Sequence, residues 1–191
     1  MQILYLKPLG RARYNPRMAR TPAQPRLTIH IEPLRDRDIG ELLTVQRAAF
    51  LHDAQLYGNP FLPSLTQTLD QLRTENSDPN RVFLVAKLGT RLVGSVRAVR
   101  RNRIIYISRL MTAPDVEGCG IGGSLLTAIE VAMAESADVF ALTTGTKSTA
   151  NIEMYLRRGY RIVEEATDDA GIRIVNMSKP ATTAAKMARD A

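Results

Sequence analysis

The sequence predicts a single α/β domain whose central sheet holds both antiparallel and parallel strands. Three observations predict this class. Short β-rich segments follow one another through tight turns in the first half of the chain, and a strand–helix–strand unit lies in the second half. A glycine-rich turn at 118–123 joins the two halves. Tight turns join antiparallel strands, whereas parallel neighbours need a crossover, so this order predicts a mixed sheet.

The elements of the first half alternate between helical and β patterns. Residues 27–33 alternate in polarity and predict a strand, and apolar residues along 36–51 predict a helix. A second helix is expected over 64–74, with Ser64 as its N-cap. Three further strands, separated by two tight turns, are expected over 81–88, 91–100 and 104–111.

The elements of the second half form the crossover unit and a closing pair of strands. The glycine-rich turn opens a helix at Ile121, and a strand over 139–144 follows it. A short helix is expected from Ser148, as its cap, to Gly159, which suits a helix C-terminus. Two closing strands, joined by a polar turn, are expected over 160–165 and 172–177.

Length and composition fit one ordinary globular domain. The chain has 191 residues, of which 45% are hydrophobic and 24% are charged. A core of this size needs no disulfide, and Cys119 has no second cysteine with which to pair. A reducing, cytoplasmic location is therefore expected. No apolar run approaches the ~20 residues that span a bilayer, so no membrane partner and no secretory signal are expected.

The positive charge belongs to the ends of the chain. The net charge is +7 and the pI is about 9.9. Residues 1–26 contribute +6, residues 27–178 contribute −1, and residues 179–191 contribute +2. The near-neutral body predicts no nucleic-acid binding by the folded part. We interpret 1–26 as a basic flexible tail, 27–180 as the folded domain and 181–191 as a second tail; a transit segment or nucleic-acid arm is the alternative for 1–26.

The glycine-rich turn predicts a site for phosphate. Gly118, Gly120, Gly122 and Gly123 let the backbone approach an anion closely, and the first amides of the following helix have no partner within that helix. A P-loop is excluded because no lysine precedes Ser124. The glycines also fit a dinucleotide fingerprint, but residues 112–117 separate them from their strand, and no acid follows the next strand at the required place.

Two segments together resemble the GCN5-related N-acetyltransferases (GNAT). Glu117–Gly122 resembles the family's Gln/Arg-x-x-Gly-x-Gly/Ala motif, with Glu117 where Gln or Arg is usual. Asn151–Tyr160 resembles the family's Asn-x-x-x-Tyr-x-x-x-Gly-Phe/Tyr motif. The resemblance runs from Leu27 to Lys179. It implies a GNAT-like acyl-CoA N-acyltransferase fold, with a sheet that splays at the cofactor site.

The resemblance also implies the reaction and its residues. An acetyl group would pass from acetyl-CoA to a primary amine by direct attack, with no metal and with the chain as a monomer or homodimer. Tyr155 would act as the acid for the departing thiolate. The cofactor-binding residues that it implies are Leu110, Met111, Thr112, Glu117, Gly118, Cys119, Gly120, Gly122, Gly123, Ser124, Asn151 and Tyr155.

The acceptor side is left more open by the sequence. The segment 50–68 is expected to border the acceptor, with Asp53, Tyr57 and Phe61 as binding residues. The acceptor can be a small molecule or a peptide or protein amine. The general base stays open among His52, Asp53, Tyr106, Ser108 and a water chain.

A group of arginines offers two interpretations. They can attract an acidic substrate or the coenzyme phosphate, or they can form a solvated surface. Their positions around the third hairpin are Arg97, Arg100, Arg101, Arg103 and Arg109.

Three alternative functions stay open from the sequence. A noncatalytic CoA-binding regulatory module is one, because a carboxylate at Glu117 would repel a pyrophosphate. A nucleotide-binding oxidoreductase is the second. The third is a nucleophilic Cys119, since a helix N-terminus lowers the pKa of a thiol.

Overall fold

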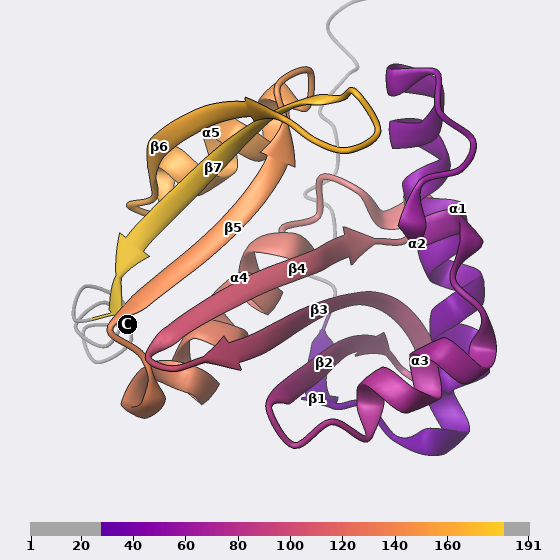
Figure 1. Ribbon diagram of the computed structural model, residues 1–191. Helices are drawn as coiled ribbons and strands as arrows, with labels where there is room; N and C mark the ends of the chain where they lie inside the picture. Colours follow the sequence, from indigo (N-terminus) through magenta and orange to yellow (C-terminus); the bar gives the residue numbers. More distant parts are fainter. Residues whose placement is uncertain (1–27, 182–191) are drawn as a thin grey trace, which may run out of the picture.

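A seven-stranded mixed sheet runs through the molecule (Figure 1), of which the computed structural model describes residues 28–181. The strand order is β1-β2-β3-β4-β5-β7-β6. β4 and β5 pair in parallel, and the other neighbours pair antiparallel, which confirms the predicted mixed sheet. The strands are β1 (Ile29–Pro33), β2 (Arg81–Leu88), β3 (Arg91–Arg101), β4 (Ile104–Thr112), β5 (Val139–Gly145), β6 (Arg161–Thr167) and β7 (Arg173–Pro180).

Helices cover both faces of the β1–β4 half of the sheet. α4 (Ile121–Met133) lies behind the sheet in Figure 1, and α1 (Ile39–Tyr57) and α3 (Leu69–Asn76) pack on the other face. The remaining helices are α2 (Pro63–Thr66) and α5 (Thr149–Arg157), with 3₁₀ turns at Asp36–Asp38, Pro114–Val116 and Ala134–Ser136. Within residues 28–181, no helix is both long enough and apolar enough to cross a membrane.

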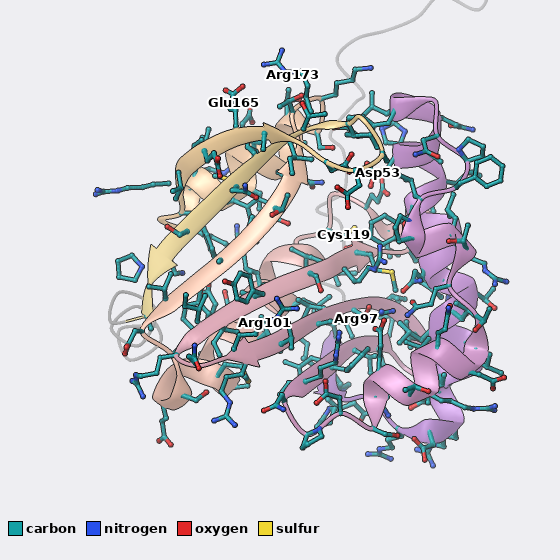
Figure 2. All side chains as sticks on the ribbon, viewed as in Figure 1. Asp53, Arg97, Arg101, Cys119, Glu165 and Arg173 are labelled. Carbon is teal, nitrogen blue, oxygen red and sulfur yellow. The ribbon has the colours of Figure 1, made fainter. Side chains whose placement is uncertain are left out.

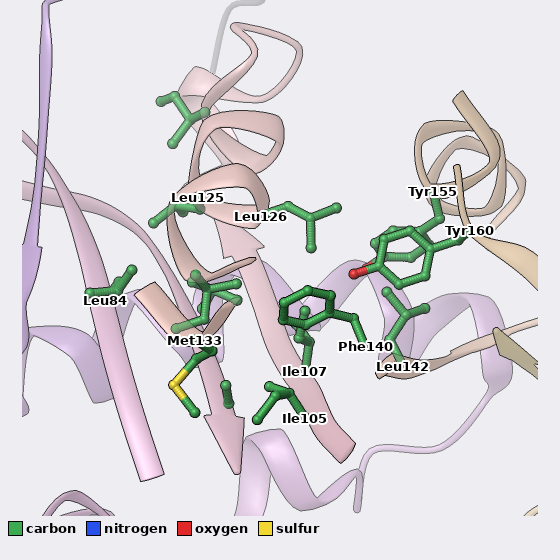
Figure 3. Packing of buried hydrophobic residues seen from close by; sticks show 14 of the residues in the cluster. Leu84, Ile105, Ile107, Leu125, Leu126, Met133, Phe140, Leu142, Tyr155 and Tyr160 are labelled. Carbon is green, nitrogen blue, oxygen red and sulfur yellow. The ribbon is translucent and has the colours of Figure 1, made fainter. Parts of the chain in front are cut away.

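The larger core lies between α4 and the sheet (Figure 3). Leu125 and Leu126 of α4 share this cluster with Phe140 of β5. A smaller core lies under α1 and α3. Alternate residues of β2 enter the two cores, Leu84 the larger and Phe83 the smaller, as the two-residue repeat of a strand requires.

The predicted second helix is wrong, because two helices replace it. α2 begins at Pro63, and α3 begins after a reciprocal capping box in which Thr68 and Gln71 each accept a backbone N–H from the other. Ser64 is buried rather than a cap. The first helix continues beyond its predicted end to Tyr57 and stops at Gly58, which has a left-handed φ of +64°.

The sheet opens between β4 and β5. The parallel pairing runs from Ile104 with Val139 to Ile107 with Leu142 and goes no further. A bulge in β4 then shifts its register against β3, so that Ser108 faces Arg97 while Met111 faces Ser95. β5 instead continues along β7. The diverging strand ends give the splayed sheet that the resemblance implies.

The predictions for residues 1–26 and 182–191 lie outside the described residues. Ala181, which the sequence placed in the second tail, is buried in the larger core, and its amide donates to the carbonyl of Asp138 at 2.9 Å. The described fold therefore includes Ala181, one residue beyond the predicted end of the domain.

Candidate active site

Two adjoining pockets lie where the sheet opens. The larger pocket, of about 600 Å³, is bordered by the end of β4, the glycine-rich turn and the first turns of α4 and α5. The smaller pocket, of about 210 Å³, lies between α1, the start of α2, the diverging ends of β4 and β5, and the β6–β7 turn. Both are lined by Phe50, Asp53, Leu110, Ser148 and Asn151. A ligand in the larger pocket can therefore present one end to a ligand in the smaller.

The glycine-rich turn forms one wall of the larger pocket. Gly118 and Gly120 have φ values of +76° and +81°, which glycine adopts without strain. The first helical hydrogen bond of α4 runs from the Ser124 amide to the Gly120 carbonyl at 3.1 Å. The amides before Ser124 have no carbonyl within the helix to bond, so the wall suits an anion.

Basic side chains that the sequence reasoning missed complete this wall. Lys147, Arg157 and Arg158 line the larger pocket. The guanidinium of Arg158 lies so close to Gly123 that a Cβ at Gly123 would collide with it. Because Arg157 and Arg158 stand immediately before the glycine of the second motif, their place in that motif could have flagged them.

The structure brings most of the implied cofactor residues together. The larger pocket is lined by Leu110, Met111, Thr112, Glu117, Gly118, Gly120, Gly122, Gly123 and Asn151. Cys119 and Ser124 line neither pocket, and the exposed Cys119 thiol lies 3.8 Å from the Glu117 carbonyl oxygen. Tyr155 lines the smaller pocket rather than the larger.

Tyr155 is a buried phenol beside the shared wall. Its ring packs edge-on against Tyr160, with centroids 5.8 Å apart. Burial and the nearby charge of Asp53 raise the pKa of Tyr155 to about 12. The hydroxyl therefore stays protonated at neutral pH and can donate a hydrogen bond or a proton.

Asp53 is a half-buried carboxylate that lines both pockets (Figure 2). Burial raises its pKa, the positive charge of His52 lowers it, and the negative charge of Glu117 raises it. The charge of Asp53 in turn raises the pKa of Tyr155, so Asp53 interacts electrostatically with both the glycine-rich turn and the phenol. A cationic or amine-bearing ligand is the natural partner for a carboxylate in this place.

The other predicted acceptor residues separate. Tyr57 lines the smaller pocket, and its hydroxyl accepts from the Lys147 amide at 3.0 Å and lies 3.1 Å from Ser148 Oγ, so it ties α1 to the β5–α5 loop. Phe61 is 77% exposed and lines neither pocket, so the structure does not bring it to the acceptor side. Among the base candidates, His52 and Ser108 line a pocket and Tyr106 lines none.

The predicted arginine group also divides. Arg97 is buried and binds Gln46, Gln67 and Glu75, whereas Arg101 is exposed over the ring of Tyr106 (Figure 2). Arg100 and Arg103 are exposed as well, and Arg103 pairs with Asp138 at 2.7 Å. Arg109 lines the smaller pocket. A solvated surface therefore describes three of the five.

Among residues 28–181, no three His, Cys, Asp or Glu side chains are grouped so that they could hold a metal ion.

Solved structures share this fold. The N-acetyltransferase PaiA from Thermoplasma acidophilum, in complex with coenzyme A, is 20% identical, with a TM-score of 0.69 over 80% of this chain and 99% of that one. The spermidine N-acetyltransferase from Vibrio cholerae, in complex with coenzyme A and spermine, is 12% identical, with a TM-score of 0.67 over 82% and 98%. The ribosomal-protein-S18-alanine N-acetyltransferase from Escherichia coli is 12% identical, with a TM-score of 0.66 over 81% and 94%. No curated protein sequence matches this chain.

The fold and the paired pockets define an α/β domain with a pocket beside a glycine-rich helix start, where the free amides suit an anionic ligand. The family follows from the sequence match. Residues 53–181 match the family model described as an acetyltransferase (GNAT) domain. The chain therefore belongs to the GNAT acetyltransferase family.

Proposed function

We propose that this chain transfers an acetyl group from acetyl-CoA to a primary amine. One observation carries the proposal: the pocket formed by the glycine-rich turn shares a wall with a second pocket, and Asp53 and Asn151 belong to both. The coenzyme A complexes of the Thermoplasma and Vibrio N-acetyltransferases support the choice of cofactor.

The residues of the larger pocket fit coenzyme A. The helix-start amides and the basic side chains Lys147, Arg157 and Arg158 suit its phosphates. Beyond Ile107 the β4 edge that faces β5 pairs with no strand in the described part of the chain, so main-chain groups at Leu110–Thr112 are available to bond the pantetheine amides. Acetyl-CoA, when bound, supplies an activated acetyl thioester.

Two side chains are assigned to the chemistry: Asp53 on the shared wall and Tyr155 beside it in the smaller pocket. Tyr155 holds the proton that the leaving thiolate needs, because its raised pKa keeps the phenol neutral. Asp53, when ionised, attracts the amine of the acceptor. The base that takes the amine proton is Asp53, His52, Ser108 or water, since these candidates line the pockets and Tyr106 does not.

Ligand-induced thermal shifts test the cofactor assignment. Acetyl-CoA or coenzyme A at about 100 times its dissociation constant should raise the melting temperature by roughly 5–10 °C, while NAD and ATP should not. A shift with NAD alone would support the oxidoreductase instead. Coenzyme A binding without acetyl transfer to any amine would support the noncatalytic module, which the family assignment does not favour.

A variant pair at Gly122 separates charge from shape. A Cβ at Gly122 would meet its nearest atom, Thr112 Oγ1, at an ordinary 3.7 Å, so Gly122→Ala should bind coenzyme A nearly as the parent does. Gly122→Asp adds a negative charge at the same point and should weaken binding by roughly 10-fold or more. Gly40→Asp, on exposed α1 with nothing within 4 Å of the new Cβ, is the matched control. Unchanged affinity in Gly122→Asp would refute the phosphate site.

A further inference from the structure

Arg109 occupies a strained backbone position in the wall of the smaller pocket. The bulge in β4 leaves it with a φ of +50°, in the left-handed region that disfavours residues with a Cβ. Among residues 28–181, Asn102 is the other non-glycine residue with a positive φ, and it stands in a tight turn, where asparagine is common.

The guanidinium of Arg109 has no ionic partner among the described residues. It is half-buried, with Cζ 5.8 Å from the ring centroid of Phe50, and forms no hydrogen bond or ion pair there. Burial lowers the pKa of Arg109, and the negative charge of Glu75 raises it. Glu75 already binds Arg97 at 2.9 Å and lies 3.8 Å from Arg81, so positive charge is in excess on this side of the pocket.

The two carboxylates that line the smaller pocket, Asp53 and Asp168, form no ion pair with Arg109. Asp168 accepts the amides of Ala170 and Ile172 within its own turn, at 2.9 and 2.8 Å. Asp53 stands on the wall shared with the larger pocket, whereas Arg109 lines the smaller pocket alone. The smaller pocket therefore offers a carboxylate on the shared wall and an unpaired cation that lines the smaller pocket alone.

We propose that the acceptor is a small amine that also carries an anionic oxygen group, a carboxylate or a phosphate, which binds Arg109. This inference rests on the proposed function and names its substrate class. A guanidinium binds such groups through two parallel hydrogen bonds. With the anion on Arg109, the amine lies toward Asp53 and the cofactor. A pocket of about 210 Å³ suits a molecule of amino-acid size. A polyamine would instead bring like charge to Arg109.

Matched acceptor pairs test the substrate class. Initial rates of the full chain with acetyl-CoA are measured for leucine against leucinamide and for O-phosphoethanolamine against ethanolamine. The anionic member of at least one pair should have a kcat/KM roughly 10- to 100-fold higher. The pair that shows the preference distinguishes a carboxylate from a phosphate. The members without the anion are less basic, so a larger fraction of their amine is unprotonated. Their intrinsic reactivity is therefore higher, and a preference for the anionic members cannot come from amine basicity.

Variants at Arg109 test whether this residue binds the anionic group of the acceptor. Arg109→Gln should remove the preference by lowering kcat/KM for the anionic member alone, and Arg109→Lys should keep part of it. Both retain a Cβ, so the backbone strain is unchanged. Arg101→Gln is the control, because this exposed cation lies 5.7 Å from the ring centroid of Tyr106 and lines neither pocket. The thermal shift with coenzyme A should be equal in all of them.

The outcomes separate this inference from the proposed function. An equal loss for both members of a pair in Arg109→Gln would show that Arg109 supports the fold, and would overturn the inference. A parent enzyme that uses the neutral members or spermidine at least as well would overturn it too, while acetyl transfer itself would stand. A parent chain that neither shifts with coenzyme A nor acetylates any amine would overturn the proposed function, and the inference with it.

Discussion

Two buried polar clusters in this molecule differ in whether all of their charged groups have partners. In the first, here called the closed cluster, Glu130 accepts from Lys179 and from the Tyr160 hydroxyl, each at 2.7 Å, and Lys179 also donates to the Arg158 carbonyl at 3.2 Å. In the second, here called the open cluster, Arg97 binds Gln46, Gln67 and Glu75, but its Nε has no partner among the described residues.

The difference relates to where each cluster lies. The closed cluster lies within the α4 side of the fold, where Lys179 and Glu130 are 2% and 5% exposed, and its charges neutralise one another. The open cluster lies near Arg109 and the smaller pocket, and its carboxylate, Glu75, is partly exposed. Because an unpaired buried charge is costly, removing one partner of the closed cluster should destabilise the fold, whereas the unpaired charge of Arg109 fits the anionic acceptor group proposed above.

The largest effect should come from breaking the closed cluster. Glu130→Gln leaves Lys179 buried without a counter-charge, so the free energy of unfolding should fall by about 3–5 kcal/mol, measured by urea denaturation. Glu135→Gln, at an exposed acid, is the control. The triple variant Glu130→Leu, Lys179→Met, Tyr160→Phe should recover most of the loss. A fall in unfolding free energy of under about 1 kcal/mol in Glu130→Gln would contradict this prediction, because the ion pair would then contribute no more than an exposed surface pair.

The open cluster should tolerate disruption better. Arg97→Met removes a guanidinium whose pKa burial lowers to about 10, and it leaves Glu75 able to turn to water. We expect a loss of about 1–3 kcal/mol in unfolding free energy by the same measurement. A loss as large as that of Glu130→Gln would erase the distinction between the clusters.

Tyr155 joins the closed cluster to the pockets, since its ring packs on Tyr160 and its hydroxyl serves the proposed reaction. Tyr155→Phe keeps the ring, so stability should change by about 1 kcal/mol or less. Turnover should fall by roughly 10- to 100-fold, a modest loss because a thiolate leaves readily. Rapid-quench kinetics measure the turnover, and a titration with coenzyme A measures cofactor binding separately. Weakened coenzyme A binding with unchanged turnover would make Tyr155 a packing residue.

The local chemistry of the sequence predicted much of the fold. The glycines, tight turns and apolar spacing indicated the strands and α4, because these features act over a few neighbouring residues. The break between α2 and α3 was missed, since the capping box of Thr68 and Gln71 competes with a continuous apolar stripe. The spacing of apolar residues indicates that a segment is helical, but it does not show where one helix ends and the next begins.

The candidate site was less accessible from the sequence, because it is assembled from distant elements. The place of Arg109 depends on a bulge that shifts the pairing of β4 with β3, and no local pattern shows this shift. Phe61 was expected to bind the acceptor, yet its side chain is exposed and lines neither pocket. Arg158 meets Gly123 only because α5 packs beside the start of α4.

The smallest effect should come from the acid that departs from the family pattern. Glu117 lines the larger pocket and raises the pKa of Asp53. Glu117→Gln should therefore lower that pKa and, by removing a negative charge near the phosphates, tighten coenzyme A binding by roughly 1.5- to 5-fold. Asp53 must be ionised to attract the amine, so activity is lost as pH falls through its raised pKa. In the variant that loss should begin at a lower pH.

Glu135→Gln again supplies the control, since this exposed acid lines neither pocket. Isothermal titration with coenzyme A and a pH profile of kcat/KM measure the two effects together. Because Glu117 is exposed, both should shrink at high salt, whereas the losses in the closed cluster should not. Weaker coenzyme A binding in Glu117→Gln would mean that Glu117 stabilises the glycine-rich turn. A charged residue of this pocket would then support the fold as well as act on the ligand.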